Sequence, residues 1–102
     1  MINLKVVEFD WDDGNRGHCR KHGMSLTEIE EVFRSSELIV APDLEHSDEE
    51  DRLLAIGKTS HDRRAFIAFM FRTRHGKRFI RPIMARYMHA KEIKKYEEKE
   101  SS

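Results

Sequence analysis

Residues 63–91 read RRAFIAFMFRTRHGKRFIRPIMARYMHAK, and this segment carries the clearest pattern of secondary structure in the chain. Two runs rich in β-branched, aromatic and basic residues, Ala65–Thr73 and Arg78–Tyr87, flank the short segment His75-Gly76-Lys77. Such runs are typical of strands, and a glycine between them is typical of a tight hairpin turn. The pattern therefore predicts an antiparallel pair, in which Pro82 marks either an edge position or a β-bulge.

The first of these two runs is apolar on both faces. Phe66 falls on one face, and Ile67 and Phe69 fall on the other, because side chains alternate along a strand. We therefore expect this strand to be central in the sheet and a helix to cover one side of it. We interpret Trp11 and the series Phe66, Phe69 and Phe71 as core residues rather than as platforms for stacked bases.

Towards the N-terminus the sequence predicts a strand and then a short helix. The strand is Ile2–Phe9, which is apolar and β-branched. Asp12 or Asp13 would cap the helix, which would run to about Lys21 and stop at Gly23 in a left-handed conformation.

The next helix has an unusually complete start signal. Ser25-Leu-Thr-Glu28 is a capping box, and Met24 and Ile29 stand at the two positions of a hydrophobic staple. The helix should end near residues 34–36. Its apolar stripe at helical spacing comprises Leu26, Ile29, Val32 and Phe33.

The rest of the chain completes an α+β pattern. Leu38–Ala41 is a predicted strand stopped by Pro42, residues 43–51 form an acidic turn, Arg52–Thr59 is a further strand, and His89–Lys99 is a charged helix. We expect an antiparallel sheet of about four strands, with two N-terminal helices and one C-terminal helix.

Length and composition limit the class of protein. The 102 residues predict a single domain, residues 1–102, in which 97–102 form a frayed tail. No apolar run approaches the roughly 20 residues that cross a bilayer, and the first residues lack a signal-peptide pattern, so we expect a cytoplasmic protein without a membrane partner. Cys19 is the single cysteine, which excludes an internal disulfide and fits a reducing compartment.

Charge is separated along the chain although the net charge is zero, with 19 basic and 19 acidic residues. The acidic residues gather in residues 27–31 and 43–51, whereas residues 63–91 contain nine Lys or Arg and no acidic residue. A basic surface of this kind favours binding of a polyanion, RNA or DNA. The alternative is a solvated strand face whose arginines keep a sheet edge soluble.

From about residue 7 to residue 96 the chain carries short motifs in a fixed order. They are FDWD at 9–12, KHGMS at 21–25, EVF at 31–33, His46-Ser47, Glu50, Arg52, Ile56-Gly57, Arg64, Arg72, Arg74, Gly76, Ile80-Arg81-Pro82 and Ala85-Arg86-Tyr87-Met88. In this order and spacing they resemble the BrnT toxins of bacterial type II toxin–antitoxin modules.

The resemblance implies a fold like that of the RelE ribonuclease toxins and an endoribonuclease that inhibits translation. It also implies a cognate antitoxin, BrnA, which binds DNA as a dimer, so operator DNA would be reached only through the antitoxin. No cofactor is expected. One departure concerns Met84, where the family usually has serine, and another concerns Met70, where threonine is common. Met84 and Arg86 share a strand face, so restoring serine at position 84 should raise activity if that position lines the site.

The chemistry of metal-independent RNA cleavage suggests which residues act. The 2′-hydroxyl of the RNA is the nucleophile, so the protein must accept one proton, donate another and stabilise charge on the phosphate. The residues predicted to be catalytic are His22, His46, Glu50, Arg81 and Arg86. The residues predicted to contact RNA are Arg52, Arg64, Arg72, Arg74, Lys77 and Arg78.

Pairing about the turn predicts two arginine groups. Arg72 should lie opposite residue 79 or 80, within reach of Arg81, whereas Arg86 should lie near the point where Arg64 enters its strand. The active site should form where these arginines meet His22, His46 or Glu50.

The same residues also fit several alternative interpretations. His22 would serve only to end a helix, and Glu50 and Arg52 would form only a surface ion pair. His18 and His22 share a helix face and would need Cys19 and His46 to hold zinc, but neither an HExxH motif nor paired CxxC motifs accompany them, so we expect no metal. The alternative function is a non-catalytic nucleic-acid-binding or interaction module derived from such a toxin.

Overall fold

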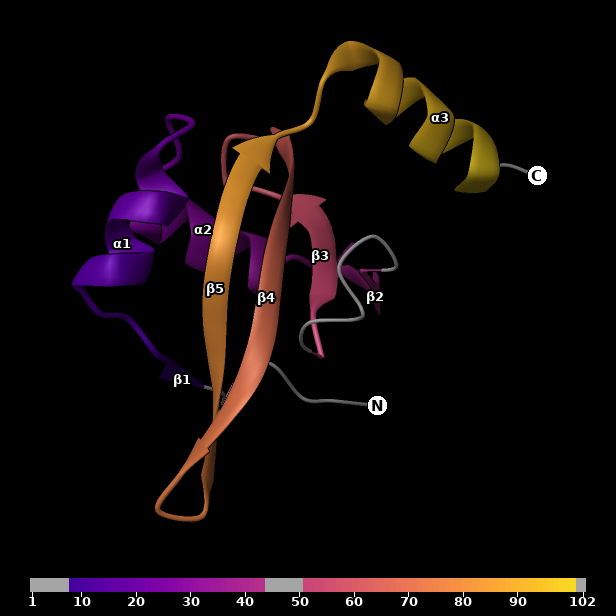
Figure 1. Cartoon of the computed structure of the whole chain (residues 1–102). Coiled ribbons are helices and arrows are strands. Elements are labelled where there is room, and N and C mark those ends of the chain that lie inside the picture. Colours follow the sequence, from indigo (N-terminus) through magenta and orange to yellow (C-terminus); the bar gives the residue numbers. More distant parts are fainter. Residues whose placement is uncertain (1–7, 44–50, 101–102) are drawn as a thin grey trace.

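The computed structural model describes residues 8–43 and 51–100. The elements, in chain order, are β1 (Glu8–Phe9), α1 (Asp13–Arg20), α2 (Leu26–Phe33), β2 (Ile39–Pro42), β3 (Leu53–Lys58), β4 (Arg64–Arg74), β5 (Lys77–Tyr87) and α3 (Ala90–Glu100) (Figure 1). Within the described residues no helix is long and apolar enough to cross a membrane.

The five strands form one sheet in the order β1-β5-β4-β3-β2. The pairs from β2 to β5 are antiparallel, whereas β1 runs parallel to β5 through Glu8↔Phe79 and Phe9↔Ile80. The α+β class is confirmed, but the expected sheet of about four antiparallel strands is wrong in strand number and in the direction of β1. This pair joins segments far apart in the sequence through only two residues, so no local pattern could indicate it.

The β4–β5 hairpin is as predicted. Arg74 pairs with Lys77, and His75 and Gly76 between them have φ of 52° and 74°, the left-handed conformation that a two-residue hairpin loop requires. Ala68 pairs with Met84 and Phe69 with Pro82, so the residue between these two on β5 bulges out of the ladder. Of the two predicted roles for Pro82, the bulge is the one observed.

Both helix starts are also confirmed. Asp12 caps α1 in a capping box with Asn15, and Ser25 caps α2 in a capping box with Glu28. The first helix ends at Arg20, and Gly23 follows with φ of 91°. Leu38, expected in the next strand, precedes β2, and Pro42, expected to stop that strand, is its last residue. An edge strand accepts proline because one side of its backbone needs no partner.

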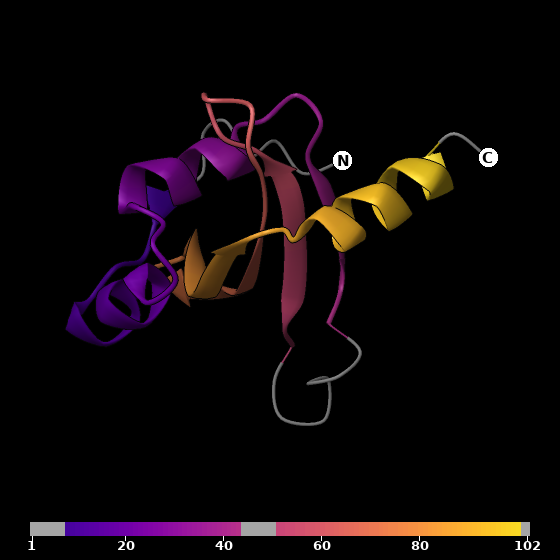
Figure 2. The same ribbon diagram turned by 90° about the horizontal axis from the view of Figure 1, so that it is seen from above.

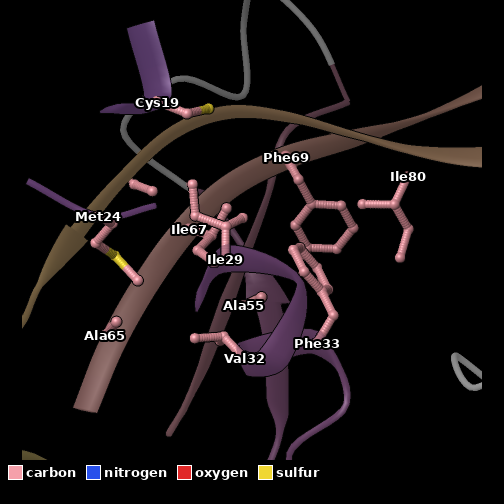
Figure 3. Close-up of a cluster of buried hydrophobic side chains, with 11 residues drawn as sticks. Cys19, Met24, Ile29, Val32, Phe33, Ala55, Ala65, Ile67, Phe69 and Ile80 are labelled. Carbon is pink, nitrogen blue, oxygen red and sulfur yellow. The ribbon is translucent and has the colours of Figure 1, made fainter. Parts of the chain in front are cut away.

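The helix α2 covers one face of the sheet, and the core lies between them (Figures 2 and 3). Phe33 of α2 packs edge-on against Phe69 of the central strand β4, with ring centroids 4.9 Å apart. A Cβ at Gly57 would approach the Val32 carbonyl to 2.9 Å, so only glycine lets α2 lie this close to β3. The residues buried in this cluster are Cys19, Met24, Ile29, Val32, Phe33, Ala55, Ala65, Ile67, Phe69, Ile80 and Ala85.

Trp11, Phe69 and Phe71 belong to this core or pack against it, as expected. Phe66 does not, because it lies on the opposite face of β4, where Arg86 stacks over its ring.

Candidate active site

Three arginines converge on one buried carboxylate. Asp10 is 7% exposed, and its Oδ2 lies 3.4 Å from Nη1 of Arg72 and 3.4 Å from Nη1 of Arg81. Its Oδ1 lies 3.5 Å from Nη2 of Arg74. Asp10 reaches this position because it directly follows β1, and its amide donates to the Ile80 carbonyl of β5 at 2.8 Å. The parallel β1–β5 pair therefore places a carboxylate beside the arginines of the hairpin.

A second carboxylate orients Arg81. Asp12, which caps α1, accepts a hydrogen bond from Nη1 of Arg81 at 2.9 Å. The hydrogen bond from Arg81, with a further one from the Asn15 amide, lowers the pKa of Asp12, and the same pair raises the pKa of Arg81. Arg81 is therefore charged and fixed in direction, with donors remaining for another anion.

A cavity of about 350 Å³ opens beside these arginines. It is lined by Gly14, Asn15, His18, Met70, Arg72, Arg81, Pro82 and Ile83, which come from α1, β4 and β5. Asn15 fastens α1 to the hairpin, because its Nδ2 donates to the Asp10 carbonyl at 2.9 Å and to the Pro82 carbonyl at 3.0 Å. This cavity combines two guanidinium groups with one imidazole, that of His18.

Arg86 occupies a different place, at the far end of the sheet. Its Nη1 and Nη2 donate to the two carboxylate oxygens of Glu92 at 2.7 and 2.8 Å, and its guanidinium lies 4.0 Å from the centre of the Phe66 ring. The hydrogen bond from Arg86, with a further one from the His89 amide, lowers the pKa of Glu92 to about 2. Arg64 lies nearby, 3.7 Å from Glu97 of α3.

The predicted arrangement of two arginine groups therefore agrees with the observed register. Arg72 pairs with Phe79 beside Arg81, and Phe66 pairs with Arg86 next to the start of β4. The bulge contributes to this arrangement. Arg81 and Arg86 would lie on opposite faces of a regular strand, but Met70↔Arg81 and Phe66↔Arg86 place them on the same face as alternate residues of β4.

The described part of the structure does not place His22, His46 or Glu50, the residues expected to transfer protons, in this cavity. His22 is exposed in the turn after α1 and makes no hydrogen bond or ion pair with the described residues. His46 and Glu50 lie outside the described residues. His18, one helical turn before His22, is the histidine that lines the cavity. The same i, i+4 spacing indicated it, but only as a possible metal ligand.

The other basic residues predicted to contact RNA do not line the cavity, and Arg78, which pairs with Thr73, lies on the opposite face of the hairpin from Arg72 and Arg81. Arg78 stacks over Phe71 with 3.9 Å to the ring centre, and Lys77 pairs with Glu8. Arg52 precedes β3 directly, so one step beyond the Leu53↔Phe69 pair places it level with Met70, a cavity residue. Asp10 and Asp12 were not expected as site residues, although two acids separated by one residue after a predicted strand were a signal.

The described residues contain no group of three or more His, Cys, Asp or Glu side chains arranged to hold a metal ion. Cys19, the possible zinc ligand beside His18, is buried in the core, where burial raises the pKa of its thiol to about 11. A protonated thiol facing the core is a poor metal ligand.

Comparison with known proteins identifies one family. The sequence model of the family described as "Ribonuclease toxin, BrnT, of type II toxin-antitoxin system" matches residues 11–92. The chain matches no curated protein. The matched segment contains α1, α2, the strands β2 to β5 and the first part of α3.

Proposed function

Since the chain belongs to the BrnT family of ribonuclease toxins of type II toxin–antitoxin systems, we propose that it cleaves RNA in the cavity between α1 and the β4–β5 hairpin. The observation that carries this proposal is the meeting of His18, Arg72 and Arg81 in one cavity of about 350 Å³. A cavity of this volume accommodates one nucleotide with its phosphate. The likeness to RelE toxins in fold is part of the same proposal.

The chemistry follows from these groups. A base removes the proton of the RNA 2′-hydroxyl, the 2′-oxygen forms a bond to phosphorus, and the bond from phosphorus to the 5′-oxygen breaks as that oxygen takes up a proton. Arg81 and Arg72 stabilise the charge on the non-bridging oxygens. The products are a cyclic phosphate and a 5′-hydroxyl, and no step of this route requires a metal ion.

We assign one proton transfer to His18 and the other to His22, His46 or Glu50. His22 follows His18 by one helical turn and is the nearest of these along the chain. Arg86 is proposed to bind a flanking phosphate, and RNA contacts along the strand are assigned to Arg52, Arg64, Arg72, Arg74, Lys77 and Arg78. Cleavage of mRNA would inhibit translation in the cytoplasm.

The antitoxin is proposed to be of the BrnA type and to cover the arginines of the hairpin. Arg72 and Arg74 are 39% and 52% exposed, so an acidic segment of a partner reaches them directly. The toxin would then meet operator DNA only through the antitoxin.

A non-catalytic nucleic-acid-binding module is the second candidate. It is favoured by Met70, which lines the cavity without offering a hydroxyl or a proton-transfer group. Under this alternative the protein would bind RNA through the same arginines and leave it intact.

Cleavage of a fluorescent RNA by the purified protein in excess EDTA separates the two candidates. We expect cleavage by the wild type and a loss of about 100-fold or more in His18→Asn and in Arg72→Ala. The matched control is His75→Asn, an exposed turn histidine whose left-handed conformation asparagine adopts readily. RNA binding without cleavage by the wild type would support the non-catalytic module. Full cleavage by both variants would refute this location of the site.

A further inference from the structure

We propose that Asp10 is a positioning residue, whose buried carboxylate sets the guanidinium groups of Arg72 and Arg81 at the spacing that a scissile phosphate requires, without itself contacting RNA. This inference rests on the proposed ribonuclease function and adds a residue that the family assignment does not identify.

The burial of Asp10 calls for an explanation. An ionised carboxylate that is 7% exposed is costly unless cations compensate it. Here three arginines from two strands supply the compensation. One arginine would have sufficed for charge, so the convergence of three indicates that the carboxylate also organises the arginines.

The contacts of Asp10 with its three arginines are longer than those of a bidentate ion pair. Strong hydrogen bonds between guanidinium and carboxylate groups measure about 2.7–2.9 Å, and the Arg86–Glu92 pair has this geometry. The contacts of Asp10 with Arg72, Arg74 and Arg81 measure 3.4–3.5 Å and share two oxygens. Each guanidinium has five N–H donors, so Arg72 and Arg81 keep donors free for a phosphate, whereas the two nitrogens by which Arg86 would bind a phosphate bidentately both donate to Glu92.

The carboxylate cannot follow the arginines, because its backbone is fixed. The Asp10 amide donates to the Ile80 carbonyl at 2.8 Å, and the Asp10 carbonyl accepts from Asn15 at 2.9 Å. Asn15 also donates to the Pro82 carbonyl at 3.0 Å, so Asp10 is held on both sides of Arg81. Without this fixed anion, Arg81 would be held by Asp12 alone, and Arg72 would lose the carboxylate that it contacts among the described residues. The two guanidinium groups on adjacent strands would then repel each other, and their spacing would no longer be fixed.

Removal of the charge should therefore affect binding and chemistry in opposite directions. Loss of one negative charge beside three arginines strengthens the attraction for the RNA polyanion, so KM should not rise. Arginines that are no longer held in place stabilise the transition state less, so kcat should fall. A residue that only maintained the fold would lower the amount of active protein and would not produce this split.

The test compares Asp10→Asn with Asp13→Asn, which removes a fully exposed carboxylate from the first turn of α1. For Asp10→Asn we expect a fall in kcat of about 10-fold or more with an unchanged or lower KM, and for Asp13→Asn we expect wild-type values of both. Thermal melts of all variants report folding. Wild-type kcat in a folded Asp10→Asn variant, or a raised KM with unchanged kcat, would overturn the proposal while leaving the ribonuclease function intact.

A second variant keeps the test decisive if Asp10→Asn does not fold. Asp10→Glu preserves the charge but moves it by one methylene, so it should fold and should show kcat reduced several-fold with KM unchanged. Wild-type kcat in Asp10→Glu would overturn the positioning role. Absence of cleavage by the wild-type protein itself would instead refute the proposed function.

Discussion

Arg81 and Arg86 lie on the same face of β5, but their guanidinium groups are held in different ways. Arg81 is 17% exposed, contacts Asp10 and Asp12, and lines the cavity. Arg86 is 26% exposed and is engaged by both oxygens of Glu92. The described contacts of Arg81 with Asp10 and Asp12 all use Nη1, so its other donors can reach a phosphate in the cavity, whereas Arg86 must exchange its carboxylate for a phosphate. We therefore place the reacting phosphate at Arg81.

Met70 and Met84, the two positions at which the resemblance leads us to expect hydroxyl residues, are also distinguished by position. Met70 lines the cavity with Arg72 and Arg81, whereas Met84 pairs with Ala68 outside it. Met70→Thr should therefore raise RNA cleavage several-fold, because a hydroxyl would donate to the bound phosphate. Met84→Ser is the matched variant and should change cleavage less. Single-turnover rates with one RNA check both, and the opposite order would place the reaction nearer Arg86.

At the scale of elements, predictability depended on distance along the sequence. The hairpin and both capping boxes join residues close in the chain, so turn chemistry and spacing indicated them. The pair β1–β5 joins Glu8 to Phe79, and it alone brings Asp10 to the arginines. The hairpin register predicted which arginines are neighbours, but no local signal could identify Asp10 as the carboxylate that they contact. His18 was missed as a site residue because its choice over His22 depends on where α1 ends and on how it packs against β5. The helix ends at Arg20, so His22 lies in the turn beyond it, whereas His18 lines the cavity.

The helix α3 depends on charge for its attachment. It extends away from the end of β5 (Figures 1 and 2), and its described contacts with the sheet include the Arg86–Glu92 pair and the approach of Arg64 to Glu97. Among the α3 side chains whose burial is described, Ala90 is exposed and Ile93 is only partly buried, so these two contribute little buried apolar surface. The position of α3 should therefore respond to conditions that change these charges.

A pH titration tests this dependence. The pKa of Glu92 is about 2 in the folded protein, below its ordinary value of 4.5, chiefly because of the hydrogen bond from Arg86. The stabilisation is therefore complete above about pH 4.5 and is lost as the pH falls towards 2. The Glu92 carboxyl resonance should titrate near pH 2, and α3 should detach as it does. Because Glu92 is 37% exposed, we expect a modest effect on global stability. In Glu92→Gln, α3 should be loosened already at pH 7, and a firmly docked α3 there would contradict this account.

At the scale of the whole molecule, a net charge of zero conceals a basic hairpin, which brings arginines of both its strands to Asp10. Asp10, Asp12 and Glu92 form ion pairs with arginines of this hairpin and so neutralise part of its positive charge. RNA and an antitoxin would therefore compete for the same exposed guanidinium groups, and inhibition would need no conformational change in the toxin.

This competition makes a prediction about the antitoxin complex. If an acidic segment of the antitoxin covers the hairpin, Arg72→Ala combined with Arg74→Ala should weaken binding about 10-fold or more, and association should slow as salt is raised. Arg16→Ala is the matched control, because Arg16 is exposed on α1 and pairs only with the exposed Asp13 among the described carboxylates. Surface plasmon resonance at several salt concentrations measures the association and dissociation rates of each variant. Wild-type affinity of the double variant would show that the antitoxin binds elsewhere, and inhibition would then require a change of shape transmitted to the cavity.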